Sequence, residues 1–169
     1  MTSPSSSATA RAWEVLAGVA DPEIPVVSVV DLGIVRDVRV EGGALEVTVT
    51  PTYSGCPATQ VIEASIRRAL ADAGFDATVR TALAPAWTTD WMTASGRAKL
   101  ERFGIAPPGS RAPDVPAPLR FYRAEPALVS CPHCGSDDTE CLAEFGSTAC
   151  KALYRCRDCR EPFEYFKPL

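Results

Sequence analysis

Hydrophobic and polar residues alternate with two different periods over the first hundred positions, and each period predicts one kind of element. A helical period runs from Pro57 to Ala73, and Gly74 follows it at the position where glycine commonly ends a helix. One face of this segment consists of Val61, Ile62, Ser65, Ile66, Ala69, Leu70 and Ala73. Charged residues occupy another face, so the segment predicts an amphipathic helix packed on a core.

A period of two marks the predicted strands. Residues Ile34 to Val40 and Leu45 to Val49 alternate apolar and polar side chains, and the turn sequence EGG at 41–43 joins them into a hairpin. Phe75 to Leu83 predicts a third strand after the long helix. A right-handed crossover through that helix would place the third strand parallel to the second.

Two further helical patterns flank these elements, at Ala8 to Val19 and near Ser95 to Arg102. The resulting order is α-β-β-α-β-α. We therefore predict an α+β protein in which residues 8–105 form a small mixed α/β sandwich, followed by a C-terminal β module.

The composition changes at APPGSRAPDVPAP, residues 106–118, where five of the thirteen residues are proline. Proline fixes φ and has no backbone donor, so this stretch predicts an extended and semi-rigid connector. We assign residues 106–126 to a linker and residues 127–169 to a separate cysteine-rich module.

The cysteine-rich module contains two C-x2-C pairs, Cys131 with Cys134 and Cys156 with Cys159, separated by 21 residues. This spacing is typical of a zinc ribbon, in which each C-x2-C pair forms a tight turn, called a knuckle, and four thiolates form a tetrahedron. Metal binding would supply much of the folding energy of so short a module. Zinc is favoured over rubredoxin-type iron because CPHCG has a knuckle glycine and CRDCR has none, although four thiolates accept either metal. A disulfide-bonded or disordered tail is the less favoured alternative.

Several other residues of this module receive structural interpretations. Cys141 and Cys150 lie in two predicted strands around a turn at 145–147, and His133 lies inside the first knuckle, where we expect it to face solvent. The aromatic residues expected to cover the ribbon or present it to a partner are Phe163, Tyr165 and Phe166.

Composition excludes several classes of function. The net charge is −4 and the pI is about 5.1, which argues against nucleic-acid binding through phosphate neutralisation and against a cation-led membrane role. No apolar run approaches the roughly 20 residues of a membrane span, and the N-terminus lacks a secretory signal, so we expect a cytoplasmic protein. With a single histidine and no Gly-rich phosphate loop, cysteine must carry the chemistry.

Cys56 has no other cysteine among the first 130 residues and stands between the second strand and the long helix. If Pro57 is the first helical residue, Cys56 is the N-cap and faces the free amides of Ala58 and Thr59. Those donors and the helix dipole would favour a thiolate. The position also follows the carboxyl end of a strand, where open α/β sheets bind ligands. The alternative is a cysteine that only fills the core.

Three acidic residues form the second part of the candidate site. Asp21 and Glu23 belong to DPEIP, and Asp31 precedes Leu-Gly. Turn structure explains each of them most simply, because aspartate commonly starts or caps a turn. The functional interpretation is that this acidic segment folds back beside Cys56 and tunes or gates it.

The stretches DPEIPVVSVVDLGIV and VTPTYSGCPATQVIEASIRRAL together resemble the SufT-like metal–sulfur cluster assembly domain. The resemblance matches that family's cysteine to Cys56 and its Asp-Pro-Glu motif to Asp21, Pro22 and Glu23. The tail EFGSTACKALYRCRDCREPFEYFK narrows the resemblance to the PaaD family of phenylacetyl-CoA epoxidase subunits, over nearly the whole chain after residue 8. Cys141 has no counterpart in the family pattern.

The resemblance implies an accessory factor, without catalytic activity of its own, that helps mature the iron–sulfur or other metal centres of a multicomponent phenylacetyl-CoA epoxidase, a monooxygenase of aromatic catabolism. It implies that Cys56 transiently holds iron, an iron–sulfur cluster or a persulfide while the ribbon docks onto a protein client of that complex. One alternative is a structural or docking subunit with an inert Cys56. Another is a thiol enzyme in which His133 approaches Cys56 through the hinge. The identity of the client, and whether the chain forms a homodimer, are left open.

Overall fold

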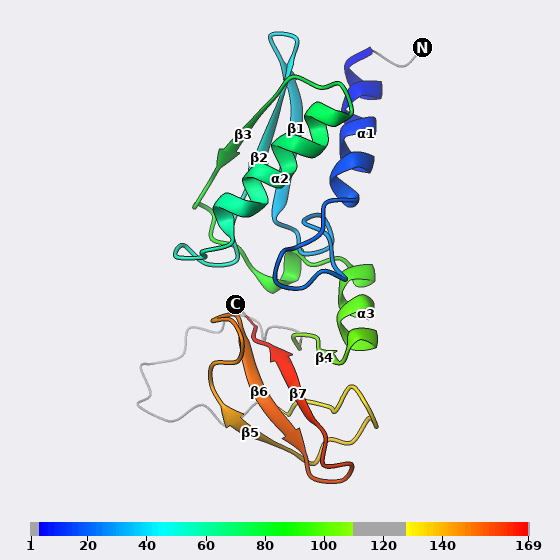
Figure 1. The fold of residues 1–169 in the computed structure, drawn as a ribbon, viewed down its shortest axis with the longest axis vertical. Coiled ribbons are helices and arrows are strands. Elements are labelled where there is room, and N and C mark those ends of the chain that lie inside the picture. The colour runs from blue at the N-terminus through cyan, green and yellow to red at the C-terminus, as the bar shows by residue number, and fades with distance from the viewer. Residues whose placement is uncertain (1–3, 110–127, 169) are drawn as a thin grey trace. The chain divides into compact units, whose positions relative to one another are not determined.

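The structure, a computed structural model, describes residues 4–109 and 128–168 and divides into two units between Lys99 and Leu100 (Figure 1). Most of the predicted linker lies outside the described residues, so the linker stays a prediction. Within the described part, no helix combines the length and the hydrophobicity that a bilayer crossing requires.

The first unit contains the predicted α-β-β-α-β-α order, with one short 3-10 helix added. Its elements are α1 (Pro4–Ala17), β1 (Val35–Glu41), β2 (Ala44–Val49), α2 (Thr59–Asp72), β3 (Ala77–Thr81), η1 (Thr89–Trp91) and α3 (Ala94–Phe103), which crosses the unit boundary. Helix α1 begins four residues earlier than the sequence predicts, and β3 is shorter than predicted at both ends.

The three strands of this unit form one mixed sheet in the order β1-β2-β3. Gly42 and Gly43 connect β1 to β2 with φ values of 61° and 91°, the left-handed conformation that a two-residue hairpin turn requires. Strand β3 pairs with β2 in parallel, with Val79 opposite Val47. The predicted hairpin and the predicted parallel third strand are both confirmed.

Both long helices cover the same face of this sheet, because α1 packs on β1, α2 packs on β3, and the helices contact each other (Figure 1). The buried side chains that α2 contributes are Ile62, Ile66 and Leu70. Burial of each such side chain stabilises the unit by about 1.5–3 kcal/mol. Val61 is 51% exposed, so the apolar face of α2 is narrower than the sequence predicts.

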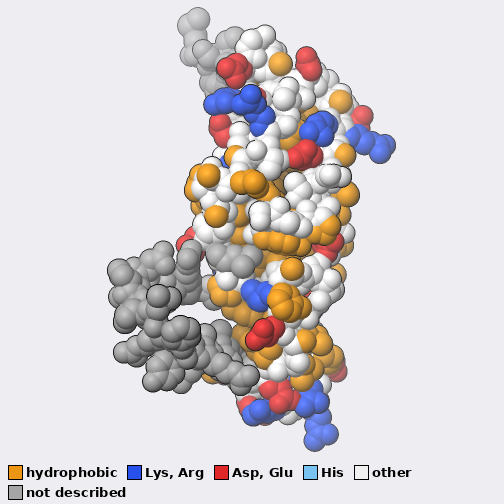
Figure 2. All heavy atoms as spheres, turned by 90° about the vertical axis from the view of Figure 1, so that its left-hand side faces the viewer, with side chains coloured by type: hydrophobic (Ala, Val, Ile, Leu, Met, Phe, Trp, Pro, Cys, Tyr) orange, Lys and Arg blue, Asp and Glu red, His pale blue; other side chains and the backbone are white. Residues whose placement is uncertain are grey.

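The opposite face of the sheet is charged and needs no apolar cover. Glu46 of β2 pairs with Arg39 of β1 and, at 3.2 Å, with Arg80 of β3. Elsewhere, Figure 2 shows one side of the molecule, on which Lys and Arg side chains lie among Asp and Glu side chains.

The long segment between α1 and β1 folds back on itself. The Val29 amide donates to the Val19 carbonyl at 2.9 Å, and the Asp21 amide donates to the Val27 carbonyl at 2.9 Å. The Thr50 amide, just after β2, donates to the Ile34 carbonyl at 2.8 Å. The acidic segment and the loop that carries Cys56 consequently leave from the same end of the sheet (Figure 1).

The second unit contains a four-stranded sheet with the order β4-β7-β6-β5. Its strands are β4 (Ile105–Ala106), β5 (Thr139–Ala143), β6 (Lys151–Cys156) and β7 (Pro162–Phe166). Strands β5, β6 and β7 pair antiparallel, and β4 pairs with β7 in parallel. The two strands predicted around the 145–147 turn are confirmed as β5 and β6.

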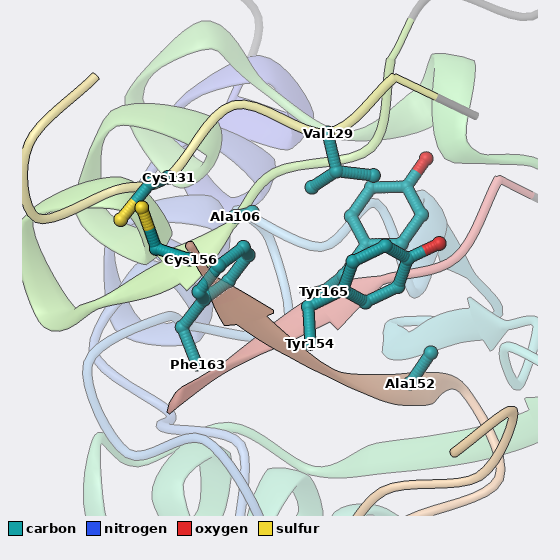
Figure 3. Close-up of a cluster of buried hydrophobic side chains, with 8 residues drawn as sticks. All are labelled: Ala106, Val129, Cys131, Ala152, Tyr154, Cys156, Phe163 and Tyr165. Carbon is teal, nitrogen blue, oxygen red and sulfur yellow. The ribbon is translucent and has the colours of Figure 1, made fainter. Parts of the chain in front are cut away.

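A small cluster of buried side chains forms the core of this ribbon unit (Figure 3). Tyr154 stacks on Phe163 at a ring-centroid distance of 5.9 Å and meets Tyr165 edge-on at 5.5 Å. Phe166 is 1% exposed. Phe163 and Tyr165 therefore lie in the core of the ribbon, while Phe166 is buried outside this cluster. Two of the cysteines, Cys131 and Cys156, belong to the same cluster.

Candidate functional site

The four cysteines of the two C-x2-C pairs come together at one end of the ribbon. Their sulfur atoms all lie within 4.8 Å of one another, with 3.7 Å between Cys131 and Cys159 and 3.6 Å between Cys134 and Cys156. Tetrahedral ligation with metal–sulfur bonds near 2.3 Å requires sulfur separations of about 3.8 Å. A disulfide requires about 2.05 Å. The cluster therefore fits one tetrahedral metal ion and does not fit disulfides.

The two knuckles have matching backbones. The Cys131 amide donates to the Ser136 carbonyl at 2.8 Å, and the Cys156 amide donates to the Glu161 carbonyl at 3.1 Å, each five residues further on. The residue after the second cysteine of each pair has a positive φ, 77° at Gly135 and 65° at Arg160. Arg160 thus adopts a turn that glycine normally supplies. The motif CRDCR has no glycine at this position, and that difference favours zinc over iron in the sequence. The backbone of the second knuckle nevertheless has the same conformation as that of the first.

The protonation of the thiols points to the same chemistry. A backbone hydrogen bond from Cys159 lowers the pKa of the Cys156 thiol to about 7. At Cys159 a backbone hydrogen bond from Glu161 lowers the pKa, but burial and the neighbouring thiols outweigh it and raise the pKa to about 12. Four thiolates at this spacing therefore repel one another unless a cation lies between them.

Cys56 lies on the loop between β2 and α2, and the structure corrects its predicted role as a helix cap. Helix α2 begins at Thr59 and its N-cap is Ala58, with no side-chain cap hydrogen bond. The Cys56 carbonyl accepts from the Thr59 amide at 3.2 Å and from the Thr59 hydroxyl at 2.9 Å. Its own amide donates to the Tyr53 carbonyl at 3.1 Å. Cys56 thus joins two successive turns through its backbone.

The side chain of Cys56 is half-buried, while its neighbours Ser54, Gly55 and Pro57 are exposed. A β-carbon added at Gly55 would approach nothing closer than 3.8 Å, so this part of the loop is open. Residue Cys56 is therefore not fully buried, as a cysteine that only fills the core would be.

Asp21 and Asp31 are buried residues that hold turns, as their simpler interpretation predicts. One oxygen of Asp21 accepts from the amides of Glu23 at 2.9 Å and Ile24 at 2.8 Å. A carboxylate oxygen of Asp31 accepts from the Ser28 amide at 3.0 Å. The side chain of Glu23 is exposed. That the three acids act on Cys56 stays a prediction.

Asp31 also forms hydrogen bonds with residues at and near the start of α3, a connection that sequence spacing does not reveal. Its carboxylate accepts from Lys99 at 2.6 Å and from the Thr93 hydroxyl at 3.3 Å, and its carbonyl accepts from the Thr93 amide at 2.9 Å. Gly96 lies against the Asp31 backbone, where an added β-carbon would come within 2.7 Å of the carbonyl oxygen.

The remaining residues singled out in the ribbon lie outside the four-sulfur cluster. Cys141 is exposed on β5, and the Cys150 thiol lies 3.0 Å from the Thr148 hydroxyl. His133 is exposed, as expected, and its ring lies where a β-carbon at Gly104 would meet it at 3.0 Å.

Comparison with known proteins identifies both units. The family model described as "PaaD zinc beta ribbon domain" matches residues 116–167, and the model described as "Iron-sulfur cluster assembly protein" matches residues 9–83. An Escherichia coli (strain K12) protein, named as a putative subunit of 1,2-phenylacetyl-CoA epoxidase, is 48% identical over 156 residues, 92% of this chain and 90% of that protein. The chain belongs to the PaaD family.

Two partial relatives match the N-terminal part of this PaaD-family chain. "Fe-S protein maturation auxiliary factor YitW" of Bacillus subtilis (strain 168) is 40% identical over 78 residues, 44% of this chain and 76% of that protein. The crystal structure of a domain of unknown function, DUF59, from Bacillus anthracis superposes with a TM-score of 0.53 at 25% identity, covering 57% of this chain and 93% of that chain. The PaaD-family chain thus joins an iron–sulfur-assembly-like domain to a cysteine ribbon.

Replacing Asp31 with asparagine in this PaaD-family chain is expected to remove an acid-sensitive part of its stability. Burial alone would raise the pKa of Asp31, but hydrogen bonds from Lys99 and Ser28 outweigh it and hold the pKa below its ordinary value of 3.8. A carboxyl group with a lowered folded-state pKa stabilises the fold above its unfolded-state pKa, and this contribution is lost as the pH falls through the folded-state value. We expect a loss of about 1–2 kcal/mol at pH 7 that shrinks below about pH 4.

Tryptophan fluorescence measures this effect in the intact chain, because all three tryptophans, Trp13, Trp87 and Trp91, lie in the first unit. Denaturant unfolding of wild type and Asp31→Asn at several pH values gives the difference in unfolding free energy. Asp37→Asn, at an exposed position of β1, is the matched control. A wild-type advantage that stays constant from pH 7 to pH 3 would show that the ionised carboxylate is not its source.

Proposed function

We propose that this PaaD-family chain is an accessory factor in the maturation of iron–sulfur or other metal centres of a multicomponent phenylacetyl-CoA epoxidase. The link to the epoxidase comes from a relative over nearly the whole chain that is named as a putative epoxidase subunit. The maturation role comes from a relative of the N-terminal part that is named as an Fe-S protein maturation auxiliary factor. In this role Cys56 transiently holds iron, a cluster or a persulfide as cargo, and the chain itself catalyses no reaction on the epoxidase substrate.

The observation that carries the proposal is the position of Cys56. It is a half-buried thiol on an open loop, inside the span that the iron–sulfur cluster assembly family matches. Thiolate is the soft ligand that binds the iron atoms of iron–sulfur clusters. The backbone turns around Cys56 fix the loop without using the thiol, which leaves the sulfur available to a cargo atom.

The acidic residues divide into two roles in this proposal. Asp21 and Asp31 support the loop end of the first unit through buried hydrogen bonds from the amides of Ile24 and Ser28. Glu23, whose side chain is exposed, is the one that can face the cargo or the client. The proposed cargo site therefore comprises Cys56 with Glu23, held in place by Asp21 and Asp31.

The ribbon carries the second proposed metal, a resident zinc ion held by Cys131, Cys134, Cys156 and Cys159. The matching family is described as a zinc ribbon, and the sulfur spacing suits zinc. Zinc has no redox chemistry, so it supplies folding energy and a rigid surface rather than electrons. We propose that this surface docks onto a protein client of the epoxidase complex.

Cys56→Ser tests the maturation role. Serine keeps the size of the side chain, and the thiol makes no cap hydrogen bond, so we expect a stability change below about 1 kcal/mol. Wild type or Cys56→Ser is co-expressed with the epoxidase components, and the iron content, sulfide content and activity of those components are measured. We expect a folded variant with a loaded ribbon, and components that carry less than half their normal metal.

Cys141→Ser is the matched control, because Cys141 is an exposed cysteine outside the four-sulfur cluster. It should leave the epoxidase components fully loaded. Fully loaded and active components with Cys56→Ser would contradict the maturation role and support the alternative, a docking subunit in which Cys56 is inert.

A further inference from the structure

The two residues between Cys156 and Cys159 both contact the end of the first knuckle, at Ser136, or the chain just after it, at Asp138. The Asp158 carboxylate accepts a hydrogen bond from the Ser136 hydroxyl. The Arg157 amide donates to the Asp138 carbonyl at 2.8 Å. The second knuckle is thus tied to the first by contacts that do not involve sulfur.

Ser136 is itself fixed from two sides, which makes it a suitable anchor. Its carbonyl accepts from the Cys131 amide at 2.8 Å, as part of the first knuckle. Its hydroxyl accepts from the Asp138 amide at 3.1 Å while donating to Asp158. Movement of Asp158 relative to Ser136 would therefore separate Cys159 from Cys131.

The contacts of Arg157 contribute less through its side chain. The guanidinium lies 3.4 Å from Asp138 and 3.3 Å from Glu140, and the Arg157 and Asp138 side chains are more than half exposed. Exposed ion pairs contribute little. The Asp158–Ser136 hydrogen bond is exposed as well, but it differs in that Ser136 belongs to the first knuckle through its own carbonyl. Substitution at Arg157 also leaves its backbone hydrogen bond in place, so Asp158 makes the side-chain contact between the knuckles that a point mutation can remove.

We propose that Asp158 is a positioning residue of the metal site, which acts through Ser136 to hold the two knuckles at the separation that four sulfur ligands require. The negative charge of Asp158 is unfavourable beside a four-thiolate centre, so its hydrogen bond, rather than its charge, is the useful property. Residues that orient metal ligands in this way typically change metal affinity by about 10–100-fold. The proposal rests on the four-cysteine cluster and does not depend on the role of Cys56.

The test measures zinc affinity of the full-length chain by competition with a chelator. Asp158→Ala and Ser136→Ala should each weaken zinc binding by about tenfold, and the double variant should be no weaker than either single one, because both remove the same hydrogen bond. Asp158→Asn, which keeps an acceptor oxygen without the charge, should stay within about twofold of wild type. Asp137→Ala is the control and should keep the wild-type zinc affinity. The Asp137 carboxylate accepts from the Ser130 hydroxyl at 2.6 Å, and these two residues flank the first knuckle rather than connecting it to the second.

Cobalt(II) bound in place of zinc gives a second readout. The visible bands of the cobalt-loaded chain should broaden in Asp158→Ala and Ser136→Ala and keep their shape in Asp158→Asn, because only the first two loosen the sulfur positions. An unchanged zinc affinity together with unchanged cobalt bands in Asp158→Ala would overturn the proposal. The pairing of β5 with β6 would then be what holds the two knuckles together. Equal losses in Asp158→Asn and Asp158→Ala would overturn it by making the charge responsible.

Discussion

Replacing Cys156 with serine is expected to empty the ribbon's metal site and unfold the ribbon unit. Cys156 is fully buried, and it is at once a candidate ligand and a member of the aromatic core cluster (Figure 3). Structural zinc supplies about 10 kcal/mol or more of apparent folding free energy in domains of this kind. A domain of this size and a core of eight residues cannot replace that contribution.

The first unit should stay folded in the same variant. Its sheet, helices α1 and α2 and its tryptophans lie in residues before Leu100, and its core contains none of the four clustered cysteines. Elemental analysis of the purified variant should find no stoichiometric zinc, and limited proteolysis should remove the ribbon. Tryptophan fluorescence should still report a cooperative transition.

Cys141→Ser is again the control, and it should retain one zinc ion and a protected ribbon. A ribbon that remains protected in metal-free Cys156→Ser would show that the aromatic cluster folds without metal. Stoichiometric iron in the purified wild-type chain would show that iron, and not zinc, is the resident metal, since four thiolates accept both. Loss of the tryptophan transition along with the ribbon would contradict the division into two independent units.

The elements that the sequence predicts correctly depend on local signals. Two adjacent glycines after a short alternating run require the left-handed φ values that a tight hairpin needs, and the structure has them at Gly42 and Gly43. The cysteine spacing similarly predicts the ribbon, because each knuckle is complete within six residues. Where the information lies within a few residues of chain, periodicity and spacing are sufficient.

The predicted helix cap at Cys56 is wrong for an equally physical reason. Proline is common at the first position of a helix, but it also suits a turn, and Pro57 lies in a turn that precedes α2. The Thr59 amide and hydroxyl both bond to the Cys56 carbonyl, and this fixes the start of the helix two residues later than predicted. The choice between the two arrangements depends on the Thr59 side chain, which the rule that proline starts a helix does not take into account.

Contacts between distant residues account for the features that the sequence could not reveal. Asp31 bonds Lys99, 68 residues away, and the Trp87 indole donates to the Leu32 carbonyl at 3.0 Å, 55 residues away. Gly33 lies in this same region, and the sequence gives no sign of how closely the Trp91 backbone approaches it. The need for glycine at position 33 becomes visible only when residues 87–99 are packed against the segment before β1.

Gly33→Ala is expected to destabilise the first unit by about 3 kcal/mol or more. Gly33 has a φ of +67°, and a β-carbon there would lie 2.3 Å from the Trp91 carbonyl oxygen and 2.7 Å from its carbonyl carbon. The atoms in the way are backbone atoms of η1, so relief requires movement of the chain rather than rotation of a side chain. Such a loss is a large part of the about 5–15 kcal/mol that stabilises a typical domain.

Gly42→Ala separates the two causes of this loss. Gly42 has a similar φ of +61° and nothing within 4 Å of an added β-carbon, so it should show the conformational cost alone, about 1–2 kcal/mol. Denaturant unfolding followed by tryptophan fluorescence compares the two variants directly. The excess loss at Gly33 measures how tightly η1 is held against the acidic segment of the proposed cargo site. Equal losses at the two glycines would mean that the Trp91 backbone yields freely, and the segment around Asp31 would then be much less rigid than its hydrogen bonds indicate.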